Sequence, residues 1–274
     1  MKAKDKPILK TEKEVNKIAS AGQIHAAAMS LIDKLITQRV STLEIDYLVG
    51  KLISESGGVP SFINHYGYRH SICASVNNVI VHGIPTDKVI LPGDVVSIDI
   101  GVTFSGFIFD GAATWIVPED GTDIRNNSKD LKESSLLLSE TARLALLSGI
   151  EAARAGNYVG DISQAIASVI DPSPFSACKS FVGHGLGRSL WEEPDVPNFF
   201  REKGVRLSEG LVIAIEPIIT MGSPVATKSD DGWSELTVDG SLAAHWETTI
   251  AIVNGAPLVL SPRPLIKPSE LFIT

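Results

Sequence analysis

The order of the predicted elements indicates an α+β fold that is built from two similar halves. Two helices followed by several strands are predicted over residues 11–117, and the same order recurs over 130–253. A chain of 274 residues has the length of one large domain or two tightly fused halves. No tract with the composition of a linker separates the halves. We therefore expect a single domain over residues 1–274.

Capping boxes mark the beginning of both predicted helices in the first half. Thr11-Glu12-Lys13-Glu14 pairs a threonine with a glutamate three residues later and opens a helix to about Ile36. Ser41-Thr42-Leu43-Glu44 does the same for a helix to about Ser56. The Gly57-Gly58 pair then ends this second helix.

The strands of the first half end in a predicted hairpin. Short strands and loops are expected over residues 61–92. Residues 95–103 are almost wholly apolar or β-branched, as is typical of a buried strand. A turn at Ser105-Gly106 leads into a second apolar run at residues 107–109, which continues to Thr114.

The second half repeats this order after a polar loop over residues 118–130. Helices are predicted over 130–155 and 159–170, and Pro172 and Pro174 stop the second of them. Strands are predicted afterwards over residues 177–183, 211–221 and 243–253, with a hairpin-like stretch at 233–238. Residues 192–208 contain Pro194 and Pro197, and we predict an irregular segment there.

Composition and charge exclude several classes of protein. The 44% hydrophobic and 20% charged residues are those of an ordinary globular protein. The net charge is −8, and the lysines between Lys2 and Lys17 are too scattered to indicate nucleic-acid binding. Cys73 and Cys178 form no C-x-x-C motif, which excludes a disulfide framework or a zinc ribbon. We find no apolar signal region or membrane-length run, so we expect a cytoplasmic protein without a membrane partner.

Acidic residues interrupt several of the apolar strands. Asp99 lies in the middle of the strand at 95–103, and Asp110 directly follows the apolar run at 107–109. Glu216 and Glu247 lie in apolar runs of the second half, and His184 lies among glycines in Gly183-His184-Gly185. Burying a single carboxylate is costly, and burying several together adds repulsion. The four acids therefore require a compensating cation.

A structural ion pair with arginine and a metal site are the two sources of that cation. No arginine lies inside the strands concerned, and Arg188 is the nearest candidate. The sequence therefore favours a metal site. Two divalent ions would balance four negative charges and would provide a bridging water or hydroxide as nucleophile. Oxygen donors with one imidazole suit Mn, Fe, Co or Zn better than Mg.

The donors and their neighbouring motifs resemble a known enzyme family. Asp99, Asp110, His184, Glu216 and Glu247 occur in order with H-G-I-P at His82, G-H-G-L-G-R at Gly183, E-E-P at Glu192 and I-E-P at Ile215. Over roughly residues 10–254 this pattern resembles the bacterial type I methionine aminopeptidases of peptidase family M24. The resemblance implies the pita-bread fold of the creatinase/aminopeptidase superfamily, in which helices pack on a curved antiparallel sheet in two pseudo-symmetric halves.

The resemblance also implies a role for each donor. Asp99 would bind one metal ion, Asp110 and Glu247 would bridge both ions, and His184 and Glu216 would bind the other. A hydroxide that bridges the ions would attack the carbonyl of the N-terminal methionine. Glu216 would shuttle the proton to the leaving amine, and His82 would contact the scissile amide. The implied substrates are the N-termini of nascent polypeptides with a small second residue. The resemblance also implies a monomeric enzyme that acts at the ribosome.

The methionine side chain would enter an apolar pocket, according to the same resemblance. The residues at its lining positions are Tyr68, Cys73, Leu190 and Trp233. Trp191 lies before Glu192, where the family usually has a histidine that hydrogen-bonds the substrate carbonyl. The indole can donate one hydrogen bond but cannot exchange a proton. His65-Tyr66 reverses the usual order, and His245 replaces a usual glutamine.

Two other functions remain open on the sequence alone. A peptidase of the same fold with another specificity, such as the X-Pro type, is the first. A low-activity or non-catalytic relative of this fold is the second, and Trp191 is the residue that favours it. Retention of all five predicted metal ligands favours an active enzyme.

Overall fold

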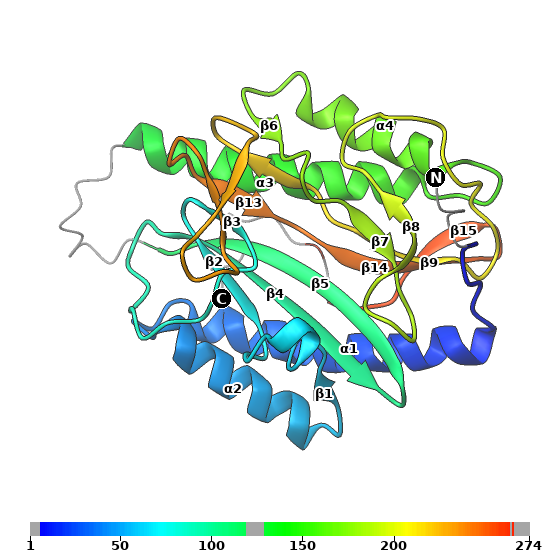
Figure 1. Ribbon diagram of the computed structural model, residues 1–274, viewed down its shortest axis with the longest axis horizontal. Coiled ribbons are helices and arrows are strands. Elements are labelled where there is room, and N and C mark those ends of the chain that lie inside the picture. Colours follow the sequence, from blue (N-terminus) through cyan, green and yellow to red (C-terminus); the bar gives the residue numbers. More distant parts are fainter. Residues whose placement is uncertain (1–5, 119–128, 264, 266–274) are drawn as a thin grey trace.

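The computed structural model describes residues 6–118, 129–263 and 265. The predicted loop over residues 118–130 lies mostly outside this part of the chain, as do the lysines before residue 6. Figure 1 shows helices on two sides of a layer of long, curved strands. The strand pairs within the sheets are antiparallel. The predicted α+β class is confirmed.

Both helices of the first half begin where the capping boxes predict. Helix α1 spans Glu12–Leu35, and the backbone N–H of Thr11 donates to the Glu14 carboxylate at 2.9 Å. Helix α2 spans Thr42–Glu55, and the Ser41 hydroxyl accepts from the backbone N–H of Glu44 at 3.1 Å. Helix α1 packs its apolar face on strands β4 (Val95–Phe104) and β5 (Phe107–Ile116).

Strands β4 and β5 form the predicted hairpin, and they pair without interruption from Val95–Ile116 to Phe104–Phe107. The turn residues Ser105 and Gly106 both have positive φ values, of 49° and 76°. Such a turn matches the right-handed twist of the strands that it joins. Strands β1 (Val59–Pro60) and β2 (Cys73–Val76) pair with the other side of β4, away from β5.

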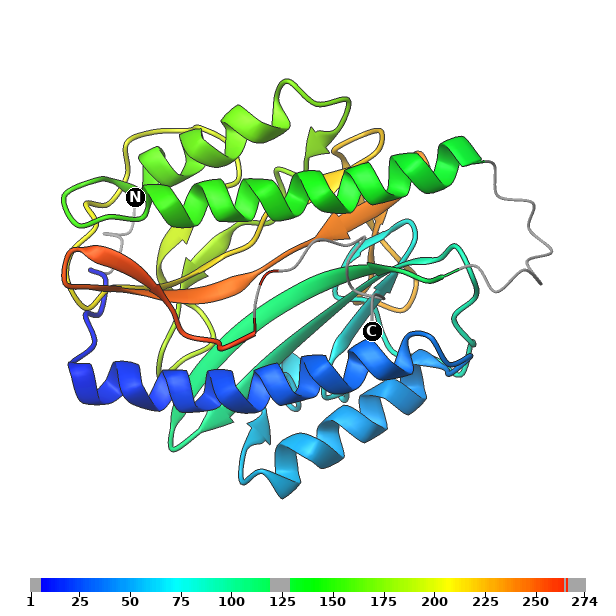
Figure 2. The same ribbon diagram turned by 180° about the vertical axis from the view of Figure 1, so that it is seen from behind.

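The two helices of the second half lie on the opposite side of the strands from α1 and α2 (Figure 2). Helix α3 spans Lys129–Ala152 and helix α4 spans Val159–Ile170. Both predicted helices are confirmed, although α3 ends before residue 155. No helix in the described part of the chain is long and apolar enough to cross a membrane.

Two long strands predicted in the second half are each broken in two. Residues 211–221 form β9 (Val212–Ile215) and β10 (Ile218–Thr220), and residues 243–253 form β13 (Ala243–His245) and β14 (Thr248–Val253). Strands β9 and β14 belong to a five-stranded sheet, whereas β10 and β13 belong to a three-stranded sheet. The prediction of two continuous strands was therefore wrong, because the chain changes sheets at each break.

Other strand predictions for the second half also need correction. Only the two ends of the predicted strand at 177–183 are extended, as β6 (Ser176–Ala177) and β7 (Gly183–Gly185). The segment predicted as irregular contains β8 (Glu192–Val196), and β15 (Ala256–Val259) was not predicted. The stretch at 233–238 contains β12 (Glu235–Thr237), which pairs with β11 (Ala226–Lys228) and with β3 (Val79–Val81).

A seam of hydrogen bonds joins β5 of the first half to β13 and β14 of the second. Its centre is a pair of backbone bonds between Ala112 and Glu247, at 2.9 and 3.2 Å. On one side, the Thr249 hydroxyl donates to the carbonyl of Asp110 and accepts from its N–H. On the other side, the Thr114 hydroxyl bonds the carbonyl and N–H of His245 in the same way. The seam thereby fixes the backbone of Asp110 in the first half relative to that of Glu247 in the second.

Candidate metal centre

The predicted site residues of both halves line one cavity of about 760 Å³. Its lining includes residues of β4, β5 and β7 and the residues that follow β9 and precede β14, and Figure 1 shows where these strands lie in the fold. The following predicted residues line it: Tyr68, Cys73, His82, Asp99, Asp110, His184, Leu190, Trp191, Glu216, Trp233 and Glu247. The structure therefore brings together side chains that lie far apart in the sequence.

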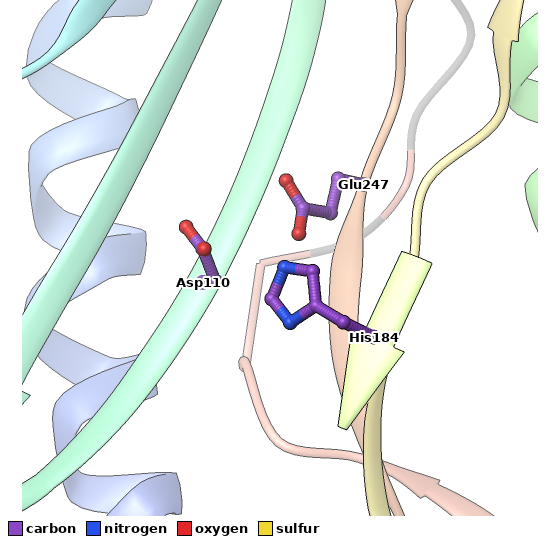
Figure 3. A group of neighbouring side chains, drawn as sticks. All are labelled: Asp110, His184 and Glu247. Carbon is purple, nitrogen blue, oxygen red and sulfur yellow. The ribbon is translucent and has the colours of Figure 1, made fainter. Parts of the chain in front are cut away.

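Three of the predicted metal ligands converge at the centre of this cavity. Asp110 comes from β5, His184 from β7, and Glu247 from the residue before β14. One donor atom from each of the three lies within 4.8 Å of the others, and all three residues are buried. Figure 3 shows the three side chains pointing toward one another from three different segments of the chain. Two carboxylates and an imidazole at this separation can hold one metal ion.

The other two predicted ligands complete the wall around these three. Glu216 lies in the break between β9 and β10, and its Oε1 is 3.7 Å from Nε2 of His184. Asp99 lies on β4, opposite Cys73 of β2. Oδ1 of Asp99 and Oε1 of Glu247 are buried without a hydrogen-bond partner. Buried oxygen atoms without partners are costly, and a bound cation would satisfy both.

Burial and mutual repulsion make it difficult to ionise the four acids together. Burial, and then the neighbouring carboxylates, raise the pKa values of Asp99, Glu216 and Glu247 well above their usual range. Burial also raises the pKa of Asp110 to about 7 and lowers that of His184 to about 4. A neutral imidazole is a metal ligand, and a divalent cation would favour the ionised carboxylates.

The alternative of an arginine counter-ion is not supported. The Arg188 guanidinium pairs with Glu14 at 3.0 Å and lies over the ring of Phe107, away from the cavity lining. Within residues 6–118, 129–263 and 265, none of the four acids forms an ion pair with an arginine or a lysine. The donor set and its buried oxygen atoms without partners therefore fit a metal centre.

His82 occupies a strained position on the wall of the cavity. Its φ of 58° is in the left-handed region, which is costly for a residue other than glycine. The ring is held against Phe181, with a centroid distance of 5.5 Å. Burial lowers the pKa of His82, so the imidazole is mostly neutral near pH 7. Strain of this kind is often found at functional sites, where surrounding contacts hold the residue in place.

The four residues predicted to enclose the methionine side chain give the cavity an apolar and aromatic lining. The rings of Tyr68 and Trp233 meet edge to face at 5.0 Å, and the Tyr68 hydroxyl donates to the carbonyl of Ile72 at 2.9 Å. Burial raises the pKa of the Cys73 thiol, which therefore remains neutral. Leu190 is also buried. This lining can receive an unbranched apolar side chain.

An aromatic cluster forms the mouth of the cavity. Trp191 is 49% exposed and stacks on Tyr66 at a centroid distance of 6.0 Å. His65 meets the same indole edge to face at 4.8 Å, and Trp191 meets His184 at 6.2 Å. The sequence predicted a role for Trp191 but assigned none to His65 or Tyr66. The one feature of the sequence that pointed to these two residues was their order, which is reversed relative to the usual order in the family.

Comparison with known proteins identifies the family. The model of metallopeptidase family M24 matches residues 16–254. The chain belongs to this family. It is 38% identical over 255 residues to a methionine aminopeptidase of Clostridium perfringens, with 93% of this chain and 98% of the relative covered. It is 39% identical over 246 residues to methionine aminopeptidase 1 of Bacillus subtilis, with 89% and 95% covered.

Solved structures of the family share the same architecture. The crystal structure of methionine aminopeptidase from Thermotoga maritima matches with a TM-score of 0.87 at 33% identity. The match covers 94% of this chain and 100% of that chain. The pita-bread fold predicted from the resemblance is thereby confirmed. An M24 metallopeptidase fold also agrees with the cluster of carboxylates and imidazole in the cavity.

Proposed function

We propose that this protein is a metal-dependent aminopeptidase that removes the N-terminal methionine from polypeptides. The observation that carries the proposal is the convergence of Asp110, His184 and Glu247 beside a buried apolar pocket. Relatives that match over nearly the whole chain are methionine aminopeptidases, which supports the same reaction here. The X-Pro specificity is not favoured by these relatives.

Five residues would hold the metal in this proposal. They are Asp99, Asp110, His184, Glu216 and Glu247, and we propose that they bind two divalent ions, because four carboxylates can balance four positive charges. Co, Mn, Fe and Zn suit this mixture of oxygen and imidazole donors. When bound, such ions act as Lewis acids on a carbonyl and lower the pKa of water, so that a nucleophile is available near neutral pH.

Two residues of the chain would handle the proton and the amide. Burial raises the pKa of Glu216, and a carboxyl with a raised pKa can accept a proton from water and donate it to a leaving amine. His82 is neutral and strained at the cavity wall, where its ring can hydrogen-bond the scissile amide. Both are assigned as catalytic residues, and Glu216 is also a metal ligand.

The cavity would select the substrate in two places. Tyr68, Cys73, Leu190 and Trp233 would enclose the methionine side chain, whose flexible thioether packs well against aromatic rings. At the mouth, the stacked rings of Trp191 and Tyr66 restrict the space that follows the scissile bond. A small second residue is therefore the expected preference.

The whole chain would act as one catalytic unit. Asp99 and Asp110 come from the half over residues 11–117, whereas the other three proposed ligands come from residues 130–253, so neither half holds a complete site. We propose a single catalytic domain over 1–274, active as a monomer in the cytoplasm on nascent chains at the ribosome.

A comparison of three peptides tests the proposal. Purified protein is loaded with Mn²⁺ or Co²⁺ and incubated with Met-Ala-Ser, Leu-Ala-Ser and Ala-Pro-Ala. Release of methionine alone is the expected result. Cleavage before proline would indicate the X-Pro specificity instead. No cleavage of any peptide by metal-loaded protein would favour a non-catalytic relative, in which Trp191 has replaced the polarising histidine.

A further inference from the structure

His245 is a buried histidine that the proposed reaction does not use. It is the last residue of β13, it lines the cavity, and only 3% of its surface is exposed. Its Nε2 is buried without a hydrogen-bond partner. A buried polar atom without a partner costs free energy, so its retention needs a physical reason.

The strand geometry directs this imidazole toward two of the proposed metal ligands. His245 ends β13 and lies two residues before Glu247, which lies in the break that precedes β14. It is also paired in register with Ile218, two residues after Glu216. Nε2 of His245 is accordingly 3.7 Å from Oε2 of Glu216 and 3.6 Å from Oε2 of Glu247.

The two oxygen atoms of Glu216 face different histidines. Oε1 lies 3.7 Å from Nε2 of His184, a proposed ligand, whereas Oε2 lies at the same distance from His245. Each glutamate thus presents its Oε2 to His245, while Oε1 of Glu216 faces His184 and Oε1 of Glu247 is buried without a partner. The distances are slightly longer than an N–H···O bond, so a small movement of the carboxylates would close one.

The backbone of His245 is fixed, which leaves little freedom for its ring. The Thr114 hydroxyl donates to the carbonyl of His245 at 2.8 Å and accepts from its N–H at 2.9 Å. The Thr114 hydroxyl is in turn 2.8 Å from that of Ser97. A neutral imidazole carries one N–H, and here that donor can lie between the two glutamates.

We infer that His245 is a positioning residue, whose Nε2–H holds the carboxylates of Glu216 and Glu247 in the orientation that binds the metal. The inference rests on the metal centre of the proposed function. Hydrogen-bond donors behind metal-ligating carboxylates fix their orientation, and their removal typically weakens metal binding by about 10–100-fold. The role differs from that of a ligand, because the nitrogen contacts the carboxylates and not the ion.

Two variants of similar volume separate this role from others. His245→Leu removes the donor, whereas His245→Gln keeps an N–H donor on a side chain of similar reach. Metal-free protein is titrated with Co²⁺, and binding is followed by calorimetry and by the visible absorption of the bound ion. We expect His245→Leu to weaken binding by about 10–100-fold, and His245→Gln to remain within roughly threefold of the wild type with the same absorption bands.

Thermal unfolding of the same variants provides a readout that does not depend on activity. Without metal, His245→Leu should melt at or above the wild-type temperature, since it removes a buried nitrogen that has no partner. With Co²⁺ it should gain less stability than the wild type, because it binds the ion more weakly. A metal-free variant that melts well below the wild type would show a structural role and overturn the inference.

The remaining outcomes also decide between the proposals. Equal Co²⁺ affinity in the wild type and His245→Leu would overturn the positioning role but leave the metal centre intact. Weak binding and altered absorption bands in His245→Gln would make His245 a direct ligand, which also contradicts the inference. If the wild type itself binds no Co²⁺, the metal centre of the proposed function fails, and the positioning role fails with it.

Discussion

The two halves of the molecule deliver their acids to the cavity by different means. In the first half, Asp99 and Asp110 lie within an unbroken hairpin, whose strands pair along their full length. In the second half, Glu216 and Glu247 lie where predicted strands break, at the residues between β9 and β10 and between β13 and β14. A regular strand aims side chains by simple alternation, whereas a break can aim one side chain independently of its neighbours.

Specific contacts stabilise the two breaks of the second half. The Asn198 amide donates to the carbonyl of Glu216 at 2.9 Å, and the N–H of Trp246 donates to the carbonyl of Pro217 at 3.2 Å. The indole N–H of Trp246 donates to Ser139 of α3 at 2.9 Å. Backbone groups that leave a sheet at a break therefore find other partners, as buried polar groups require.

The largest expected effect tests whether both halves contribute equally to the centre. Asp110→Asn and Glu247→Gln each remove one negative charge with little change in shape, one from the hairpin and one from a break. We expect each to lower kcat/KM for Met-Ala-Ser by on the order of 1000-fold, because each loses several kcal/mol of metal-dependent stabilisation of the transition state. Methionine release is measured at matched Mn²⁺ occupancy.

An exposed acid provides the control for this pair. Asp130 lies in the first turn of α3, outside the cavity lining, and Asp130→Asn should leave methionine release unchanged. A large loss from Asp110→Asn together with a mild loss from Glu247→Gln would show that the second half plays a minor part. That result would contradict a centre shared between the halves.

The residues of the centre were predictable because their chemistry is unusual for their surroundings. An acid within an apolar run is costly wherever the strand pairs, so Asp99, Asp110, Glu216 and Glu247 stood out before any pairing was known. The hydroxyls of Thr114 and Thr249 were not predictable in this way. Threonine is ordinary in a strand, and its role in the seam depends on which strands become neighbours.

The strand predictions failed for two physical reasons. Strand β8 contains Pro194, which was taken as a sign of irregular structure, and β15, for which no prediction was made, contains Pro257. Both strands lie at the edges of the five-stranded sheet, where a residue without a backbone N–H is tolerated. The breaks at Glu216 and Glu247 were missed because apolar composition does not reveal a change of sheet.

A smaller effect is expected from the seam that joins the halves. Thr249→Val removes the hydroxyl that bonds both backbone groups of Asp110, and it leaves those buried groups without partners. We expect a loss of about 2–3 kcal/mol in the free energy of unfolding. Displacement of Asp110 should also lower kcat/KM by up to about 100-fold. Denaturant unfolding and methionine release measure the two effects.

Thr249→Ser is the matched control, since it keeps the hydroxyl and removes only a methyl group. It should restore most of the activity and stability that Thr249→Val loses. If valine and serine behave alike, the hydroxyl does not hold Asp110, and the hairpin alone positions the acids of the first half.

The smallest expected effect concerns the mouth of the cavity, where rings from both halves meet. Trp191 of the second half contacts His65 and Tyr66 of the first half and lies beside His184. Trp191→His would provide an imidazole that can polarise a substrate carbonyl, and we expect kcat for Met-Ala-Ser to rise by about tenfold. A well-placed donor to a substrate carbonyl can change kcat by more than tenfold. Here the gain should be smaller, because His65 and Tyr66 are packed around an indole and not around an imidazole.

Trp191→Phe separates the hydrogen bond from the space that the ring occupies. Phenylalanine keeps an aromatic ring against Tyr66 but has no donor, so kcat should not rise, while a smaller ring widens the mouth. If Trp191→Phe accelerates methionine release as much as Trp191→His, then steric restriction by the indole limits the enzyme. If neither variant is faster than the wild type, Trp191 does not limit catalysis, and the mouth affects only the choice of second residue.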